Sequence, residues 1–420
     1  MPDPAPAYPI FDADSLRAWI GGLSPVRASL GSTPGDWRIR EVGDGNLNLV
    51  FIVEGPQGSV CVKQALPYVR AAGPSWPMAP RRAFFENAYY KAVAPHVGAR
   101  IPRIHHYDDA LYCTVMERLS PHIILRQGLI EGRRYPDAAR DVGEYVAHAG
   151  FFTSDFARPF EEKLAGVALF AGNKDLIRIS VDLIFTDPFR ESVRNRHTSP
   201  QLDAVVRDLR GDGPLKVAAA DCGRRFLTDA QALLHGDLHS GSVMVTERDT
   251  RVIDPEFACY GPIGFDLGAY VANLLLSWYS QPGHATPADD RSAQQRWILT
   301  EIETFWETFR ARFLALWAAH GRGDALPAAM FEGGEADAAA LQAARVAFVE
   351  SLFADMIGFG ACKMIRRIVG FAHVADFERI ADADIRARCE ARALAFARLL
   401  LTHPRQFRAI GDVLDAVPRA

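Results

Sequence analysis

The sequence predicts an α+β protein with two lobes, a small β-rich N-terminal lobe and a larger, mainly helical C-terminal lobe. In residues 37–63, polar and apolar residues alternate around glycines, which indicates antiparallel strands joined by turns. From about Asp137 onward, apolar residues recur with the 3.6-residue period of helices. We therefore expect an N-terminal lobe over residues 1–118 and a C-terminal lobe over residues 119–420.

The composition is that of an ordinary globular enzyme. The 420 residues suffice for two lobes with a core each, and 51 acidic against 47 basic side chains give a net charge of -4, which does not indicate nucleic-acid binding. The six cysteines are scattered without a CxxC pair, as in proteins of the reducing cytoplasm. The N-terminus lacks the pattern of a signal peptide, and the most apolar long stretch, residues 346–369, contains five charged residues, too many for a membrane span. We expect a cytoplasmic protein with no membrane partner.

The order of elements follows from the turn signals. After the predicted hairpin, a Pro/Gly-rich loop over residues 68–80 leads into a helix, and two strands follow near residues 101–107 and 111–117. The helical part contains one β-like interruption, ALLHGDLHSGSVMVTERDTRVIDPEF, in which short strands are expected at residues 243–246 and 251–253.

A glycine loop joins the first two predicted strands. Gly43-Asp44-Gly45-Asn46, followed by Asn48, stands where backbone N–H groups can cover the phosphates of a nucleotide. The third glycine of a GxGxxG pattern is absent, and a simple hairpin turn also explains these residues.

Lys63 strengthens the nucleotide interpretation. It ends a predicted strand, the position of the lysine that binds the α- and β-phosphates in kinases, and Glu86 on the following helix is its natural partner. A solvated lysine and an exposed helix glutamate are the alternatives. Met116, Glu117 and Leu119 lie at the end of the last strand of the lobe, where a hinge would present backbone groups to adenine.

Two carboxylates carry the strongest catalytic signal. Asp237 lies in the sequence HGDLH, and Asp254 follows 17 residues later in DPE, with apolar strands between them. In the kinase fold, one Asp of a catalytic loop orients the attacking hydroxyl and accepts its proton, and a later Asp holds magnesium on the phosphates. Asp237 is the predicted base and Asp254 the predicted magnesium ligand.

Two alternatives explain the same residues differently. Asp237 could cap a helix, and Pro255 could merely set the chain direction after a strand. His235 and His239 could also bind zinc together with Asp254, although their spacing requires a helix and Gly236 argues against one.

Arg366 and Arg367 end a segment that is apolar nearly all round. At least one guanidinium should therefore be buried, and a buried arginine requires an anionic or polar partner such as phosphate or Asp237. At most one of the two is expected to be a solvated cation at a helix end.

The motifs GDGNLN, VCVKQ, MERL, HGDLHSGSVMV and VIDPEFACYGPIGFDLG together resemble the S-methyl-5-thioribose kinase family, a branch of the aminoglycoside and choline phosphotransferase-like kinases. The resemblance runs from about residue 37 to 375 and implies a bilobal protein-kinase-like fold with ATP between the lobes. HGDLH and DPEFA are more specific than the general kinase elements, because protein kinases have HRD and DFG in their place.

The resemblance implies a role for each matching residue. Asp237 would be the base for the anomeric hydroxyl of methylthioribose, Asp254 and Glu256 would hold Mg2+, and Trp76 would lie in a lid over the nucleotide. The twin arginines, Arg366 and Arg367, would reach the sugar and the transferring phosphoryl group.

Two further positions lie beside the predicted catalytic residues. Ser242 stands where a protein kinase has the Asn that binds a second magnesium, so the metal count stays open. Asp266 is expected to support the catalytic loop or to cap the next helix.

We therefore expect an ATP- and Mg2+-dependent kinase that phosphorylates the 1-hydroxyl of S-methyl-5-thio-D-ribose in methionine salvage, and the family suggests a homodimer. One alternative keeps the fold but uses a choline, homoserine or aminoglycoside hydroxyl as acceptor. The other is a catalytically silent nucleotide-binding scaffold.

Overall fold

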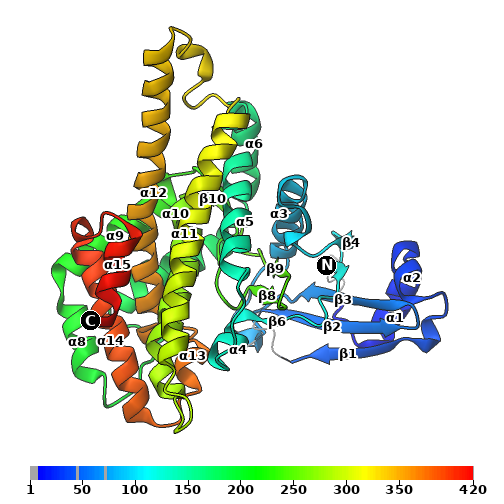
Figure 1. Ribbon diagram of the computed structural model, residues 1–420. Helices are drawn as coiled ribbons and strands as arrows, with labels where there is room; N and C mark the ends of the chain where they lie inside the picture. The colour runs from blue at the N-terminus through cyan, green and yellow to red at the C-terminus, as the bar shows by residue number, and fades with distance from the viewer. Residues whose placement is uncertain (1–7, 44–46, 71–72, 420) are drawn as a thin grey trace, which may run out of the picture. The chain divides into compact units, whose positions relative to one another are not determined.

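The structure is a computed structural model that describes residues 8–43, 47–70 and 73–419 (Figure 1). The chain folds into two units, each with its own packing. The first contains the described residues up to Ala94 together with Ile101–Pro121, and the second contains Pro95–Arg100 and the residues from His122 onward. The division after Pro121 lies three residues beyond the expected one at residue 118.

The first unit is built on a five-stranded antiparallel sheet. Its strands, in spatial order, are β1 (Arg38–Val42), β2 (Asn48–Gly55), β3 (Gly58–Ala65), β5 (Cys113–Glu117) and β4 (Ile104–Asp108). The strands predicted over residues 37–63 are present as β1, β2 and β3, which pair antiparallel in that order, and β2 and β3 close at the pair Gly55 and Gly58. Alternation along β2 and β3 buries one face of the sheet.

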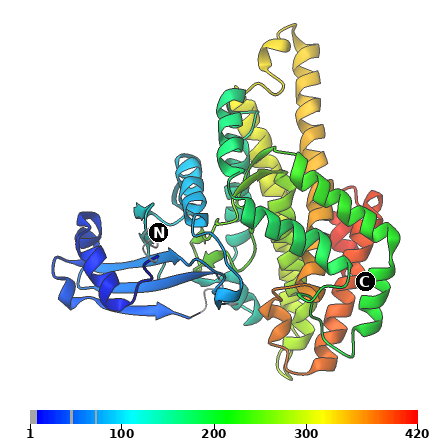
Figure 2. The ribbon, with the colours of Figure 1, turned by 180° about the vertical axis from the view of Figure 1, so that it is seen from behind.

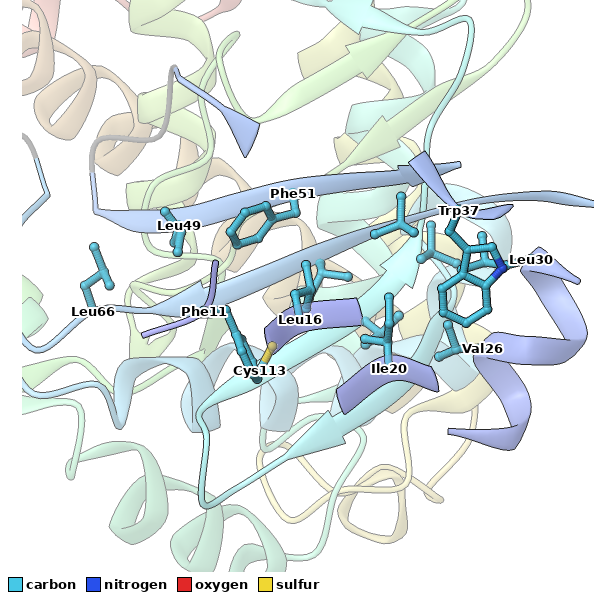
Figure 3. Close-up of a cluster of buried hydrophobic side chains, with 14 residues drawn as sticks. Phe11, Leu16, Ile20, Val26, Leu30, Trp37, Leu49, Phe51, Leu66 and Cys113 are labelled. Carbon is cyan, nitrogen blue, oxygen red and sulfur yellow. The ribbon is translucent and has the colours of Figure 1, made fainter. Parts of the chain in front are cut away.

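Two short helices, α1 (Ala13–Gly21) and α2 (Ser24–Leu30), cover that face, and the sequence analysis did not predict them. Asp12 begins α1 with a capping box, because its carboxylate accepts the N–H of Ser15 while the Ser15 hydroxyl accepts the N–H of Asp12. Figure 3 shows the resulting core, in which side chains of both helices pack on the strands. Its labelled members are Phe11, Leu16, Ile20, Val26, Leu30, Trp37, Leu49, Phe51, Leu66 and Cys113. The long helix α3 (Arg82–Val97) begins in this unit.

The second unit is mainly helical, as expected. Its α-helices are α4 (Leu125–Ile130), α5 (Ala138–Phe152), α6 (Phe160–Phe170), α7 (Lys174–Ser180), α8 (Asp203–Gly211), α9 (Gly213–Thr228), α10 (Ile263–Ser280), α11 (Ser292–His320), α12 (Glu335–Val369), α13 (Ala375–Glu378), α14 (Ala383–Thr402) and α15 (Ile410–Ala416). Helix α12 packs along α10 and α14, and α11 packs along α5 (Figures 1 and 2). The predicted fold class, a β-rich N-terminal part followed by a larger helical part, is confirmed.

Five short strands interrupt the helices of the second unit. β6 (Ile123–Ile124), β8 (Val243–Val245) and β9 (Thr250–Val252) form one small antiparallel sheet, and β7 (Ala232–Leu234) pairs with β10 (Cys259–Gly261). The two strands predicted inside the helical part are present as β8 and β9, each ending one residue early. These strands hold the loops in which the candidate catalytic residues lie.

Helices α10 and α12 cross with their backbones in close contact. A Cβ atom on Gly268 would lie 2.5 Å from the Met356 carbonyl oxygen and 2.6 Å from the Gly360 nitrogen, and one on Gly264 would lie 2.3 Å from Asp355 Cβ. Only glycine fits these positions without moving a helix. The crossing places residues 355–360 of α12 against the first two turns of α10.

Within the described part of the chain, the helices are all too short or too polar to cross a lipid bilayer.

Candidate active site

The loop that contains Asp237 is held by its neighbours in sequence and space. Gly236 has a φ of +83°, and a Cβ there would lie 2.2 Å from the Phe257 carbonyl oxygen, so glycine is required on both counts. The carboxylate of Asp266, in the first turn of α10, accepts the backbone N–H groups of His235 (2.7 Å) and Gly236 (3.1 Å). Asp266 therefore holds the backbone of the loop that contains Asp237, which is one of the two roles expected for it from the sequence.

The same loop is tied to the segment that contains Asp254. His235 Nε2 donates to the Ile253 carbonyl (2.9 Å), and the Ile253 N–H donates to the Ser242 carbonyl (2.9 Å). Asp254 itself is exposed and has a φ of +69°, an unusual backbone conformation for a residue other than glycine. The structure thus joins the two predicted catalytic segments through the residue next to Asp254.

Both predicted histidines are engaged by protein groups in this loop, which is not helical. His235 Nδ1 accepts the Asp237 N–H (3.3 Å), and His239 Nδ1 accepts the Gly241 N–H (2.9 Å). The Nε2 atoms of the two rings face Ile253 and Asp237. This arrangement leaves the zinc alternative without the helical spacing on which it depended.

Ser242 forms hydrogen bonds with the backbone of the loop that contains Asp237. Its hydroxyl accepts the His239 N–H (2.8 Å) and lies 3.0 Å from the carbonyl oxygen of Asp237. The serine therefore fixes the backbone on both sides of Leu238.

The carboxylate of Asp237 is held between two donors. Lys363 Nζ lies 3.0 Å from Oδ1, His239 Nε2 lies 3.2 Å from Oδ2, and Arg367 NH2 lies 3.8 Å from Oδ1. Burial raises the pKa of Asp237, but Lys363, His239 and Arg367 outweigh it and hold that pKa well below its usual range. Lys363 was not predicted from the sequence, and His239 was predicted only as an alternative zinc ligand.

Both arginines at the end of α12 are buried, at 8% and 6% exposure for Arg366 and Arg367, so neither is a solvated helix-end cation. Arg367 NH1 donates to the Ala372 carbonyl (2.9 Å). Nε and NH1 of Arg366 and Nε of Arg367 have no hydrogen-bond partner among the described residues. Burial lowers the pKa of both guanidinium groups.

Arg126, at the start of α4, adds a fourth cation. Its Nε lies 3.3 Å from Asp376 Oδ2, and its NH2 donates to Asn273 Oδ1 (2.8 Å). Asp237 and Asp376 both act electrostatically on Arg126, and Arg126 acts on Arg367. We call this group the basic cluster, and its members are Arg126, Lys363, Arg366 and Arg367 with the carboxylates Asp237 and Asp376. Four cations face two anions, which leaves a formal charge of +2.

In the first unit, Lys63 Nζ lies 2.8 Å from Glu86 Oε2, with side-chain exposures of 11% and 2%. The predicted pair between β3 and α3 is therefore present. Beside it, the side-chain oxygen of Asn48 accepts two bonds from Arg82, which the sequence analysis did not single out. The other N–H groups of Arg82 bond the carbonyls of residues 47, 66 and 79, so this guanidinium fixes the backbone around the glycine loop and the start of α3.

The glycine loop and Trp76 were also predicted to bind the nucleotide, and the structure describes only some of these residues. Gly43 is exposed after β1, while Asp44, Gly45 and Asn46 lie outside the described residues. Trp76 is half-buried in a short turn, where its carbonyl accepts the N–H of Val69 (2.9 Å).

At the predicted hinge, Met116 is buried in β5 and Leu119 is half-buried. Glu117 is tied to Arg103, whose N–H donates to its carboxylate (3.1 Å) and whose carbonyl accepts its N–H (2.8 Å).

Asp254 and Glu256 are the residues that could hold a metal. Glu256 is buried, and its carbonyl accepts an N–H of Asn173 (2.9 Å). No group of three or more His, Cys, Asp or Glu side chains is gathered for a metal within residues 8–43, 47–70 and 73–419. Two carboxylates are a donor set that fits Mg2+, because this ion keeps several waters and binds substrate phosphates.

Comparisons with known proteins place the chain in a family. The phosphotransferase enzyme family matches residues 38–326. Methylthioribose kinase 1 of Oryza sativa subsp. japonica is 45% identical over 410 residues, which cover 96% of this chain and 94% of that protein. Methylthioribose kinase of Escherichia coli O45:K1 (strain S88 / ExPEC) is 41% identical over 418 residues, 99% of both chains. The chain therefore belongs to the methylthioribose kinase family.

Proposed function

We propose that this protein transfers the γ-phosphoryl group of ATP to the 1-hydroxyl of S-methyl-5-thio-D-ribose, a step of methionine salvage. The observation that carries the chemistry is the fixed carboxylate of Asp237 within the basic cluster. Identity above 40% over nearly the whole chain with methylthioribose kinases supports the choice of acceptor.

Asp237 acts mainly by orienting the acceptor hydroxyl. A carboxylate whose pKa is held low is a weak base, so it takes the proton only when the O–P bond has begun to form. Phosphoryl transfer through a loose transition state depends mostly on positioning and on charge stabilisation, and both are available here.

Arg366 and Arg367 bind the transferring phosphoryl group. Their N–H groups without a partner among the described residues are buried, and a forked guanidinium matches phosphate oxygens. The formal charge of +2 in the basic cluster balances a phosphate dianion. The same charge disfavours an aminoglycoside, which is a polycation, as the acceptor.

Lys63, held by Glu86, binds the nucleotide phosphates, and Asp254 with Glu256 holds Mg2+. When bound, Mg2+ neutralises charge on the phosphates. The remaining nucleotide contacts are assigned to the glycine loop, the lid and the hinge, at residues Gly43, Asp44, Gly45, Asn46, Asn48, Trp76, Met116, Glu117 and Leu119.

A coupled assay of ADP release tests the proposal, with methylthioribose, choline and kanamycin as acceptors. We expect turnover with methylthioribose only, and a loss of about 1,000-fold in kcat for Asp237→Asn with ATP binding retained. Activity of Asp237→Asn near the wild-type rate would contradict the assigned mechanism, and turnover with choline or kanamycin instead would contradict the acceptor.

We also propose that the enzyme works in the cytoplasm as a homodimer. All six cysteines are unpaired, and five are buried, which suits a reducing compartment. Light scattering on a sizing column should give twice the chain mass of 46.3 kDa, and a monomer at micromolar concentration would contradict the dimer.

A further inference from the structure

Lys363 is a buried lysine to which the mechanism above assigns no role beyond its charge in the basic cluster. Its side chain is 2% exposed, and its ammonium contacts only two described groups at close range. One is Oδ1 of Asp237 at 3.0 Å, and the other is the ring of Phe265, whose centroid is 4.5 Å from Nζ. A lysine is rarely buried unless it has an anionic partner, so this contact with Asp237 is a specific one.

The fold fixes the position of this ammonium from two sides. Phe265 and Asp266 are adjacent in the first turn of α10, so the residue that holds the catalytic loop adjoins the one that holds Lys363. The glycine crossing of α10 and α12 sets the distance between the two helices. Lys363 lies three residues after Gly360 on α12, so a change in the packing of α10 against α12 would also displace Lys363.

His239 holds the second carboxylate oxygen but adds no charge. Because Nδ1 of His239 accepts the Gly241 N–H, the ring proton is on Nε2 and points at Asp237 Oδ2. Burial lowers the pKa of His239 to about 3, so the ring is neutral. Among the charged groups around Asp237, which are Lys363, Arg366, Arg367 and Arg126, only Lys363 lies within hydrogen-bond distance.

We infer that Lys363 is a positioning residue for phosphoryl transfer, which keeps the Asp237 carboxylate charged and in one orientation toward the acceptor hydroxyl. The inference rests on the function proposed above. With Oδ1 held by Lys363 and Oδ2 by His239, the carboxylate is fixed in one orientation, and each oxygen keeps a lone pair with which it can accept the hydroxyl of the sugar. A lysine that only packed the core would have no such effect on the reaction.

The test is the pH dependence of Lys363→Met, a neutral variant of similar length. Without the ammonium, burial raises the pKa of Asp237, so the acidic limb of kcat/KM moves to higher pH, whereas the wild-type profile stays flat in that range. We expect kcat to fall about 100-fold at neutral pH, with little change in KM for methylthioribose. Cys362→Ala, a buried neighbour on α12, is the control and should keep the wild-type profile.

A double-mutant cycle separates positioning from packing. If Lys363 acts through Asp237, then adding Lys363→Met to Asp237→Asn should slow turnover by less than about 3-fold. Additive losses, or a Lys363→Met variant with the wild-type rate and profile, would overturn the inference. If Lys363→Met melts below the assay temperature, Lys363→Gln carries the same measurements. A wild-type chain that releases no ADP with methylthioribose would refute the proposed function. That outcome is distinguishable from a failure of the Lys363 inference, in which the wild type is active.

Discussion

The two charged groups of this protein are built in opposite ways. In the first unit, Lys63 and Glu86 form a neutral pair, and Arg82 donates five hydrogen bonds to neutral oxygens. In the second unit, four cations face two carboxylates, and three buried arginine nitrogens have no partner among the described residues. The Lys63–Glu86 pair balances its own charge, whereas the basic cluster keeps a formal charge of +2, which the proposed phosphoryl group would balance.

The two groups should therefore respond differently to mutation, the first mainly in stability and the second mainly in activity. Breaking a satisfied buried pair leaves an uncompensated charge and destabilises the fold. Removing one cation from a group with excess positive charge relieves repulsion, so it should cost activity rather than stability.

The largest expected effect is on activity, in the basic cluster. Arg366→Met should lower kcat/KM for methylthioribose roughly 10- to 100-fold, because it removes charged hydrogen bonds to the phosphoryl group. Its melting temperature should equal or exceed that of the wild type. Arg310→Met, at a partly exposed ion pair with Glu350, is the matched control and should leave both quantities unchanged. A large drop in the melting temperature of Arg366→Met would break the comparison.

The next effect is on stability, in the first unit. Glu86→Gln should lower the free energy of unfolding by about 3 kcal/mol, because it removes the negative charge that lies 2.8 Å from the buried Lys63 ammonium. Denaturant titration measures the loss. The double variant Lys63→Met/Glu86→Gln removes both charges and should recover part of it, and no recovery would show that the loss comes from packing.

A smaller effect comes from ligands. Inorganic phosphate should raise the melting temperature of the wild type by about 2 °C without ATP or sugar, since it binds the folded basic cluster and not the unfolded chain. The shift should vanish in Arg366→Met/Arg367→Met and persist in Glu86→Gln. A shift of equal size in both variants would place the anion elsewhere.

The smallest effect concerns a buried carboxyl outside both groups. Burial raises the pKa of Glu390 to about 7, in contrast to Asp237, where nearby cations outweigh burial. The folded state holds this proton while the unfolded state releases it near pH 4.5, so stability falls as pH rises from about 4.5 to 7. The wild type should therefore lose free energy of unfolding between pH 5 and pH 8, and Glu390→Gln, which cannot ionise, should lose less over the same range. Parallel pH profiles for the two proteins would contradict the shift.

The sequence was informative wherever a pattern is local. The hairpin of β2 and β3, the strands around the catalytic loop, and the Lys63–Glu86 pair all follow from periodicity or from short spacings. Helices α1 and α2 were missed because they are short, although Asp12 and Ser15 form a capping box that the letters contain.

Long-range contacts were beyond prediction. Lys363 is one charge within an apolar helix, and its partner Asp237 lies 126 residues earlier in the chain. Periodicity indicates that such a lysine is buried but not which carboxylate it meets. Arg126 and Asp376 lie still further apart, 250 residues along the chain, so only the fold shows that four cations share one region.

The glycine contacts between α10 and α12 have a practical consequence for enzyme engineering. Arg366 and Arg367 follow Lys363 by three and four residues on α12. A displacement of this helix would therefore move all three charges together. Libraries meant to redirect the enzyme to other sugars should therefore leave Gly264, Gly268 and Gly360 untouched, because a methyl group there would retune the whole catalytic constellation rather than a single contact.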